Sequence, residues 1–148
     1  MDGLSNVKSS SVLDGLTGLL QDAVRATDVY KTDIHARVSA VLAPSGKIDR
    51  AAFSANQHLA HGYAWIVTYV ETLRETANWA SRLESDGKLG EIDALLAQIL
   101  FSKYLADLVG GVPMNQGETV RPHEMDALSA VDTLFGNAAV RTLITDGL

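Results

Sequence analysis

The chain has 148 residues, 47% hydrophobic and 20% charged, a balance typical of a single globular domain. Its formal net charge of −6 argues against a nucleic-acid binder, which usually carries a clustered basic face. The absence of cysteine excludes disulfides, zinc–thiolate sites and thiol catalysis. No signal peptide and no apolar run of about 20 residues is visible, so we expect a soluble, cytoplasmic protein with no membrane contact.

The first part of the chain combines a tail with a helix. Residues 1–11 are polar and short of bulky side chains, which is typical of a flexible N-terminal tail. From residue 12 to residue 41, apolar residues recur every three or four positions and predict a helix. A longer gap near Thr27 and Asp28 leaves open a division into two helices. Pro44 and the residues after it end this element.

The strongest pattern in the chain predicts one long helix from Asp49 to Asp86. Asp49 is a suitable N-cap, and Gly87 can take the left-handed conformation that ends a helix. Two apolar stripes at helical spacing indicate a face wide enough to pack against more than one neighbour. The first stripe is Leu59, Tyr63, Ile66, Val70, Leu73, Ala77 and Ala80, and the second is Trp65, Tyr69, Thr72, Thr76, Trp79 and Leu83.

A further helix is predicted from Leu89 to Val109, followed by two glycines that end it. Apolar residues cover almost its whole circumference, so we expect it at the centre of the fold. The remaining polar strip is thin and consists of Glu91, Gln98, Ser102, Lys103 and Asp107.

The last part of the chain predicts an irregular loop and two short helices. The loop covers residues 112–122, and the helices cover residues 123–135 and 137–146. No segment alternates long enough to predict a strand, so the fold class is all-α. Short loops favour antiparallel neighbours, hence a bundle with one long central helix and short C-terminal helices. Residues 12–148 then form one domain, which we expect to be excised from a longer chain.

Two histidines of the long helix are candidate binding residues. His58 and His61 are three positions apart and therefore share a helix face, which would suit two ligands of one metal ion. A di-iron bundle site needs Glu-x-x-His on two helices, and neither histidine has a glutamate three residues earlier. We therefore predict no metal site, and we favour two histidines hydrogen-bonded at a packing edge.

Other features of the long helix have packing as their ordinary explanation. Gly62 costs roughly 1 kcal/mol relative to alanine inside a helix, which close approach of another helix would explain. A ligand or partner backbone touching this point is the alternative. The aromatic residues Trp65, Tyr69 and Trp79 fit a core, or a protein interface where they are exposed.

The loop after Gly111 is the densest run of polar and turn residues. Asn115, Gln116, Glu118 and Arg121 are candidates for ligand or partner binding, since function concentrates on structured loops. The alternative is a loop whose side chains satisfy helix ends and one another. No Gly-rich phosphate loop or Ser-His-Asp pattern is present, so we predict no catalytic residue.

The segment from Asn56 to Pro122 carries a family resemblance. Its sequences NQHLAHGYAWIVTYVETLRETANWASRL and GEIDALLAQILFSKYLADLVGGVPMNQGETVRP resemble the helical N-terminal region of bacterial acyl-CoA dehydrogenase-like flavoproteins. The resemblance implies that the complete protein is an FAD-dependent enzyme that removes hydrogens from the α and β carbons of an acyl-CoA thioester. In that reaction a carboxylate takes the α-proton and the flavin takes the hydride. The flavin-binding β-domain and the catalytic glutamate of the family find no counterpart in this chain.

Two functional hypotheses follow. The first is a helical accessory domain of such an enzyme, without catalysis or a cofactor of its own, that serves packing, oligomerisation or covering of the active site. The second is a free-standing protein–protein interaction module. The expected partner is the remainder of the same polypeptide or a second copy in a homo-oligomer.

Overall fold

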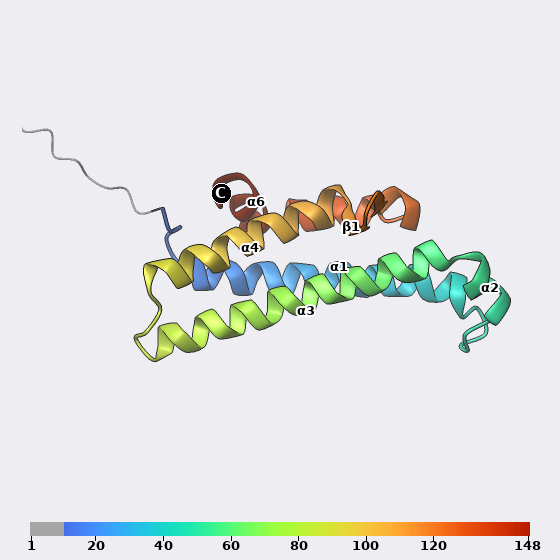
Figure 1. The fold of residues 1–148 in the computed structure, drawn as a ribbon, viewed down its shortest axis with the longest axis horizontal. Helices are drawn as coiled ribbons and strands as arrows, with labels where there is room; N and C mark the ends of the chain where they lie inside the picture. Colours follow the sequence, from blue (N-terminus) through green and yellow to red (C-terminus); the bar gives the residue numbers. More distant parts are fainter. Residues whose placement is uncertain (1–10) are drawn as a thin grey trace, which may run out of the picture.

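The computed structural model describes residues 11–148, so the predicted tail lies outside the described residues apart from Ser11. Three long helices lie side by side (Figure 1): α1 (Leu16–Leu42), α3 (Gln57–Ser85) and α4 (Glu91–Gly110). Along the chain their directions alternate, so α3 is antiparallel to both α1 and α4. The predicted fold class, an antiparallel helical bundle, is confirmed.

Helix α1 is continuous across the gap in its apolar pattern. Thr27 is fully buried there, and its hydroxyl donates to the carbonyl of Val24 at 2.9 Å. Asp28 lies at the edge toward α3, where it pairs with Arg74. Thr27 and Asp28 therefore do not divide the helix, because the hydroxyl of Thr27 and the carboxylate of Asp28 each have a polar partner.

The helix predicted from Asp49 to Asp86 is divided at Asn56 into α2 (Arg50–Ala55) and α3. Asp49 is the predicted N-cap, and its carboxylate accepts from the amide of Ala52. The side chain of Asn56 donates to the carbonyl of Ala52 at 2.8 Å, which competes with the helical hydrogen-bond pattern. Gly87 ends α3 with φ of +65°, as predicted.

The loop predicted over residues 112–122 is in part a β-hairpin, so the expectation that no strand forms is wrong here. Strands β1 (Val112–Asn115) and β2 (Glu118–Val120) pair antiparallel around Gly117, which has φ of +85°. The strands are too short for their alternation to stand out in the sequence, although Val112, Met114 and Val120 all point into the core.

The rest of the chain is a 3₁₀ turn and two short helices. The turn, η1 (Pro122–Met125), and α5 (Leu128–Gly136) replace the single helix predicted over residues 123–135. Helix α6 (Ala138–Asp146) matches its prediction and is capped by Asn137. Helix α5 packs against α1, and α6 packs against α1 and α4. None of the helices in the described part is long and apolar enough to cross a membrane.

Candidate functional site

The four predicted loop residues all lie on the hairpin or immediately after it. Asn115 and Glu118 flank the turn, and the Asn115 amide donates to the Glu118 carboxylate at 2.9 Å. Gln116 lies in the turn itself, and Arg121 follows β2. All four are exposed, so the hairpin end presents a polar surface.

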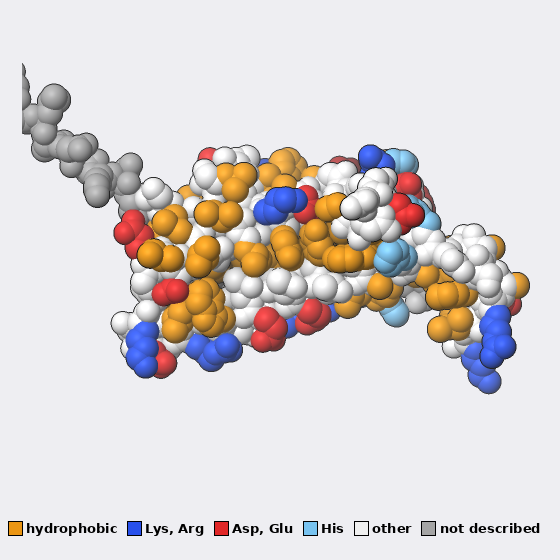
Figure 2. Space-filling model, viewed as in Figure 1, with side chains coloured by type: hydrophobic (Ala, Val, Ile, Leu, Met, Phe, Trp, Pro, Cys, Tyr) orange, Lys and Arg blue, Asp and Glu red, His pale blue; other side chains and the backbone are white. Residues whose placement is uncertain are grey.

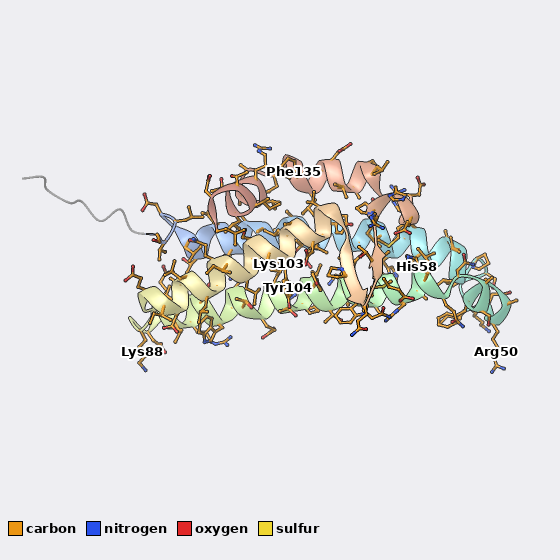
Figure 3. All side chains as sticks on the ribbon, turned by 45° about the horizontal axis from the view of Figure 1, so that its top comes forward. Arg50, His58, Lys88, Lys103, Tyr104 and Phe135 are labelled. Atoms are coloured by element: carbon orange, nitrogen blue, oxygen red, sulfur yellow. The ribbon has the colours of Figure 1, made fainter. Side chains whose placement is uncertain are left out.

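The structure brings the two predicted histidines and one of the four predicted loop residues together in one hollow. His58 and His61 on α3 line it with Glu118 of the hairpin, and Phe53 and Gln57 complete one side. We call this space, of about 730 Å³, the hairpin hollow. Figure 3 shows His58 at the end of α3 near the hairpin. Asn115, Gln116 and Arg121 are near in sequence but do not line the hollow.

Gly62 explains why the hairpin lies against this part of α3. A Cβ atom added to Gly62 would meet the side chain of Val120 at 2.6 Å. The predicted close approach is therefore correct, but the neighbour is a strand residue and not another helix. The glycine allows β2 to pack on α3 beside the two histidines.

Three polar side chains in or beside the hairpin hollow, those of His58, His61 and Glu118, have partners within the described residues. Trp65 donates its indole N–H to Nε2 of His61 at 3.0 Å. Nε2 of His58 lies 3.5 Å from the carboxylate of Glu124. A hydrogen bond from the backbone amide of Arg121 lowers the pKa of Glu124, and His58 lowers it further. Within residues 11–148, no cluster of three or more His, Asp or Glu side chains could hold a metal ion.

A second candidate site, which no sequence pattern predicts, is a groove between α3 and α4. We call it the α3/α4 groove; its volume is about 720 Å³, and it is open to solvent. Figure 2 shows orange side chains along the face where these helices run, with acidic side chains along the α3 side. The apolar lining is Val67, Trp79, Leu96, Ala97 and Leu100.

Helix α4 turns an apolar face outward, which corrects the prediction that it is central. Ile92, Leu96 and Ile99 are 74%, 59% and 46% exposed, whereas the polar Gln98 and Ser102 are 3% and 1% exposed. Ala94, Gln98, Phe101, Leu105 and Leu108 face the core instead. These five follow steps of four and three, but the exposed row Ile92, Leu96 and Ile99 has the same spacing, so the spacing does not identify the buried face.

The threonines of α3 make the groove more apolar than the sequence indicates. The hydroxyls of Thr68, Thr72 and Thr76 each donate to the carbonyl four residues earlier, at 2.8 to 2.9 Å. Their protons are thus used inside the helix and are not offered to a ligand. At the hairpin end, Tyr69 stacks on Tyr104 with ring centroids 4.2 Å apart.

Neither space fits a flavin dinucleotide. The polar side chains of the α3/α4 groove are threonines and two carboxylates, Glu71 and Glu75, with no cation to neutralise a pyrophosphate. The hairpin hollow likewise contains the carboxylate of Glu118 and no lysine or arginine. Carboxylates at these positions would repel the phosphates.

Comparison with known proteins finds sequence similarity to an enzyme. It is 35% identical over 136 residues to (2S)-methylsuccinyl-CoA dehydrogenase of Cereibacter sphaeroides, a match that covers 92% of this chain. The chain is similar to part of an acyl-CoA dehydrogenase. The match lies in the N-terminal helical region of that dehydrogenase and confirms the resemblance seen in the sequence. The chain spans only 24% of the dehydrogenase's length. No family model matches the chain.

Proposed function

We propose that this chain is a helical accessory part of an acyl-CoA dehydrogenase-related protein and has no catalysis of its own. The observation that carries the proposal is the uneven coverage of the match, which takes in 92% of this chain and 24% of the dehydrogenase. The proposed partner is a flavin-bearing dehydrogenase body that corresponds to the rest of that enzyme. The absence of cysteine is compatible with the cytoplasm, which is the proposed location.

The carboxylates of the candidate sites support a non-catalytic role. A base that removes an α-proton works best with a pKa close to the working pH. The pKa values of Glu124 and Glu71 are instead lowered, by the Arg121 amide and by Lys31 respectively. Glu118 is held by the amide of Asn115. Glu124 and Glu71 are therefore weak proton acceptors, and we assign the proton abstraction to the dehydrogenase body.

The proposed contact with the dehydrogenase body is the hairpin end. Asn115, Gln116 and Arg121 are exposed there, and the hairpin hollow brings Glu118 beside His58 and His61. Such a surface suits a partner that inserts an apolar side chain into the hollow and makes polar contacts with the exposed residues around it. This contact leaves the α3/α4 groove free for another use.

The proposal is tested with the purified chain and FAD. We expect no flavin to remain with the protein after gel filtration, and no oxidation of an acyl-CoA thioester above the rate of buffer. Stoichiometric retention of flavin would overturn the proposal, because the cofactor would then belong to this chain. A flavin-loaded acyl-CoA dehydrogenase in the same assay is the positive control.

A free-standing protein–protein interaction module is the second candidate. The exposed apolar face of α4 favours it, because large apolar patches mark interaction surfaces. A stable complex with a protein unrelated to flavin enzymes, formed through the exposed face of α4, would support this alternative. Complex formation with a dehydrogenase body through the same residues would exclude it.

A further inference from the structure

We propose that the outer face of α4 is a surface on which the dehydrogenase body packs. We call this surface the α4 face; it consists of Ile92, Leu96 and Ile99, and Leu96 also lines the α3/α4 groove. The inference rests on the proposed function, because the body is the partner proposed there. It adds a second contact to the one at the hairpin end.

The first argument is the place of the junction in the related enzyme. The matched region is N-terminal in that dehydrogenase and makes up only 24% of its length, so most of that polypeptide follows the matched region. The match takes in 92% of this chain, which places the junction at or near α6, the last helix. In the related enzyme, the body is therefore attached at or near the position of α6.

The end of α6 is held against α4. The side-chain amide of Gln98 donates to the carbonyl of Gly147 at 3.3 Å, and a Cβ atom added to Gly147 would lie 3.1 Å from that of Ser102. Figure 1 shows the end of the chain beside α4. Leu96 and Ile99 lie within one helical turn of Gln98, so the α4 face begins next to the junction.

A body attached at this point reaches the α4 face before more distant surfaces. An extended chain spans about 3.3–3.6 Å per residue, so three residues after α6 reach about 10 Å. The row from Ile92 to Ile99 is also about 10 Å long, at 1.5 Å per residue. A short tether gives an effective concentration in the millimolar range, so even a small apolar contact is occupied.

The α4 face also connects the junction to the hairpin end. Gln98 lies at the junction, and β1 follows directly after α4 ends at Gly110. The distance from Gln98 to Gly110 is about 18 Å along the helix axis. A domain of 100 residues has a radius of gyration of about 13 Å, so one globular body contacts both places by lying along α4.

The α4 face has the composition of a surface that a partner covers. Its three side chains are large and apolar, and they remain exposed in the described part of the chain. Glu75 lines the α3 edge of the adjoining groove and is exposed as well. The matching surface of the body is therefore apolar, with neutral or basic side chains opposite Glu75.

The first test is thiol labelling of a graft, the related enzyme with its matched region replaced by this chain. The chain has no native cysteine, so Leu96→Cys provides one reporter, which peptide mass spectrometry separates from any cysteine of the dehydrogenase. We expect iodoacetamide to react at least about tenfold more slowly with Leu96→Cys in the graft than in the isolated chain, because burial hinders thiol reaction.

Val29→Cys is the matched control for the labelling. Val29 is 61% exposed but lines a cavity between α1 and α5, away from the α4 face. Its reaction rate should be the same in the graft and in the isolated chain, and circular dichroism checks that both variants fold. Equal rates for Leu96→Cys in the two proteins, or equal slowing of both cysteines in the graft, would overturn the proposal.

The second test places a charge on the α4 face. Leu96→Glu should leave the melting temperature of the isolated chain nearly unchanged, because Leu96 is 59% exposed there. In the graft the same substitution buries an unpaired carboxylate, so the melting temperature should fall. Val29→Glu should lower neither. A graft as stable with Leu96→Glu as without it would contradict the contact.

The labelling result separates this inference from the proposed function. A graft that restores flavin content and activity while Leu96→Cys stays reactive keeps the proposed function and overturns the contact at the α4 face. A graft that behaves like the deleted enzyme but protects Leu96→Cys keeps the contact and overturns the proposed function. Protection that appears in the isolated chain as its concentration rises would assign the face to a second copy and overturn the inference.

Discussion

The backbone amide of Leu13 donates to Oε1 of Gln98 at 2.8 Å, although 85 positions separate the two residues. The amide group of Gln98 also donates to the carbonyls of Ser11, at 3.0 Å, and Gly147, at 3.3 Å. One buried side chain of α4 therefore holds both ends of the described fold. This arrangement explains why a polar residue occupies the inner face of an otherwise apolar helix.

Gln98→Met should lower the free energy of unfolding by about 1–3 kcal/mol, because it keeps the side-chain length but leaves buried polar groups without partners. Gln57→Met, at an exposed position of α3, is the control and should have little effect. Urea denaturation followed by circular dichroism measures both. Equal stability of the two variants would show that the Gln98 hydrogen bonds contribute nothing net.

Gly62→Ala should destabilise the protein, because the new Cβ would lie 2.6 Å from a Val120 methyl group. Overpacking of this kind costs about 1–3 kcal/mol, against a helix-propensity gain of up to about 1 kcal/mol. Gly18→Ala is the control, since a Cβ there meets nothing within 4 Å and should stabilise α1. Thermal denaturation of the two variants should therefore show shifts of opposite sign.

The same contact can be tested with a second substitution. In a Val120→Ala background two of the three close contacts to Gly62 are gone, so Gly62→Ala should cost less there than in the native protein. An unchanged cost would mean that the hairpin does not pack on α3 at this point.

Glu71→Gln should remove part of the pH dependence of stability below pH 5. A hydrogen bond from Lys31 lowers the pKa of Glu71 from its ordinary value of 4.5. The carboxylate of Glu71 therefore binds a proton more readily in the unfolded chain than in the folded one. The stabilisation by ionised Glu71 is complete above pH 4.5 and is lost as the pH falls through the folded-state pKa. The melting temperatures of native and variant proteins should differ at pH 7 and converge in acid. Asp132→Asn is the control, since Asp132 has no ion pair with any residue that the structure describes, and a constant difference at all pH values would contradict the prediction.

Asp49→Ala and Asn137→Ala both remove an N-cap, but they should differ in their effect on global stability. Each cap contributes about 1 kcal/mol. Helix α2 buries no side chain, so loss of Asp49 should speed hydrogen exchange in residues 50–55 with little change in melting temperature. Helix α6 buries Ala139, Val140 and Leu143, so loss of Asn137 should lower the melting temperature itself. Equal shifts in melting temperature would contradict the peripheral place of α2.

The helical architecture could be predicted from the sequence because its signals are local. The cap at Asp49, the stop at Gly87 and the buried stripe from Ile66 to Ala80 depend on a few neighbouring residues each. The break at Asn56 was not predicted, because an asparagine inside an apolar pattern is compatible with either a helix or a turn until its side-chain partner is known.

The candidate sites could be predicted only in part, because they depend on contacts between distant segments. His58 and Glu118 were identified separately, and only the packing of Val120 on Gly62 brings them into one hollow. The outward face of α4 was missed for a different reason. The composition of a helix that is apolar all round does not show which side is buried. Gln98 is buried and Leu96 is exposed, which is the reverse of what their polarity predicts.

The proposal of an accessory part is tested most directly by a graft into the related enzyme. The matched region of the Cereibacter sphaeroides dehydrogenase is replaced by this chain, and flavin content and acyl-CoA oxidation are compared with the intact and deleted enzymes. We expect the deletion to lose flavin or activity and the graft to restore most of both. Glu118→Lys in the graft, at the hairpin end, should weaken that restoration. A graft that folds but behaves like the deletion would contradict the proposed function.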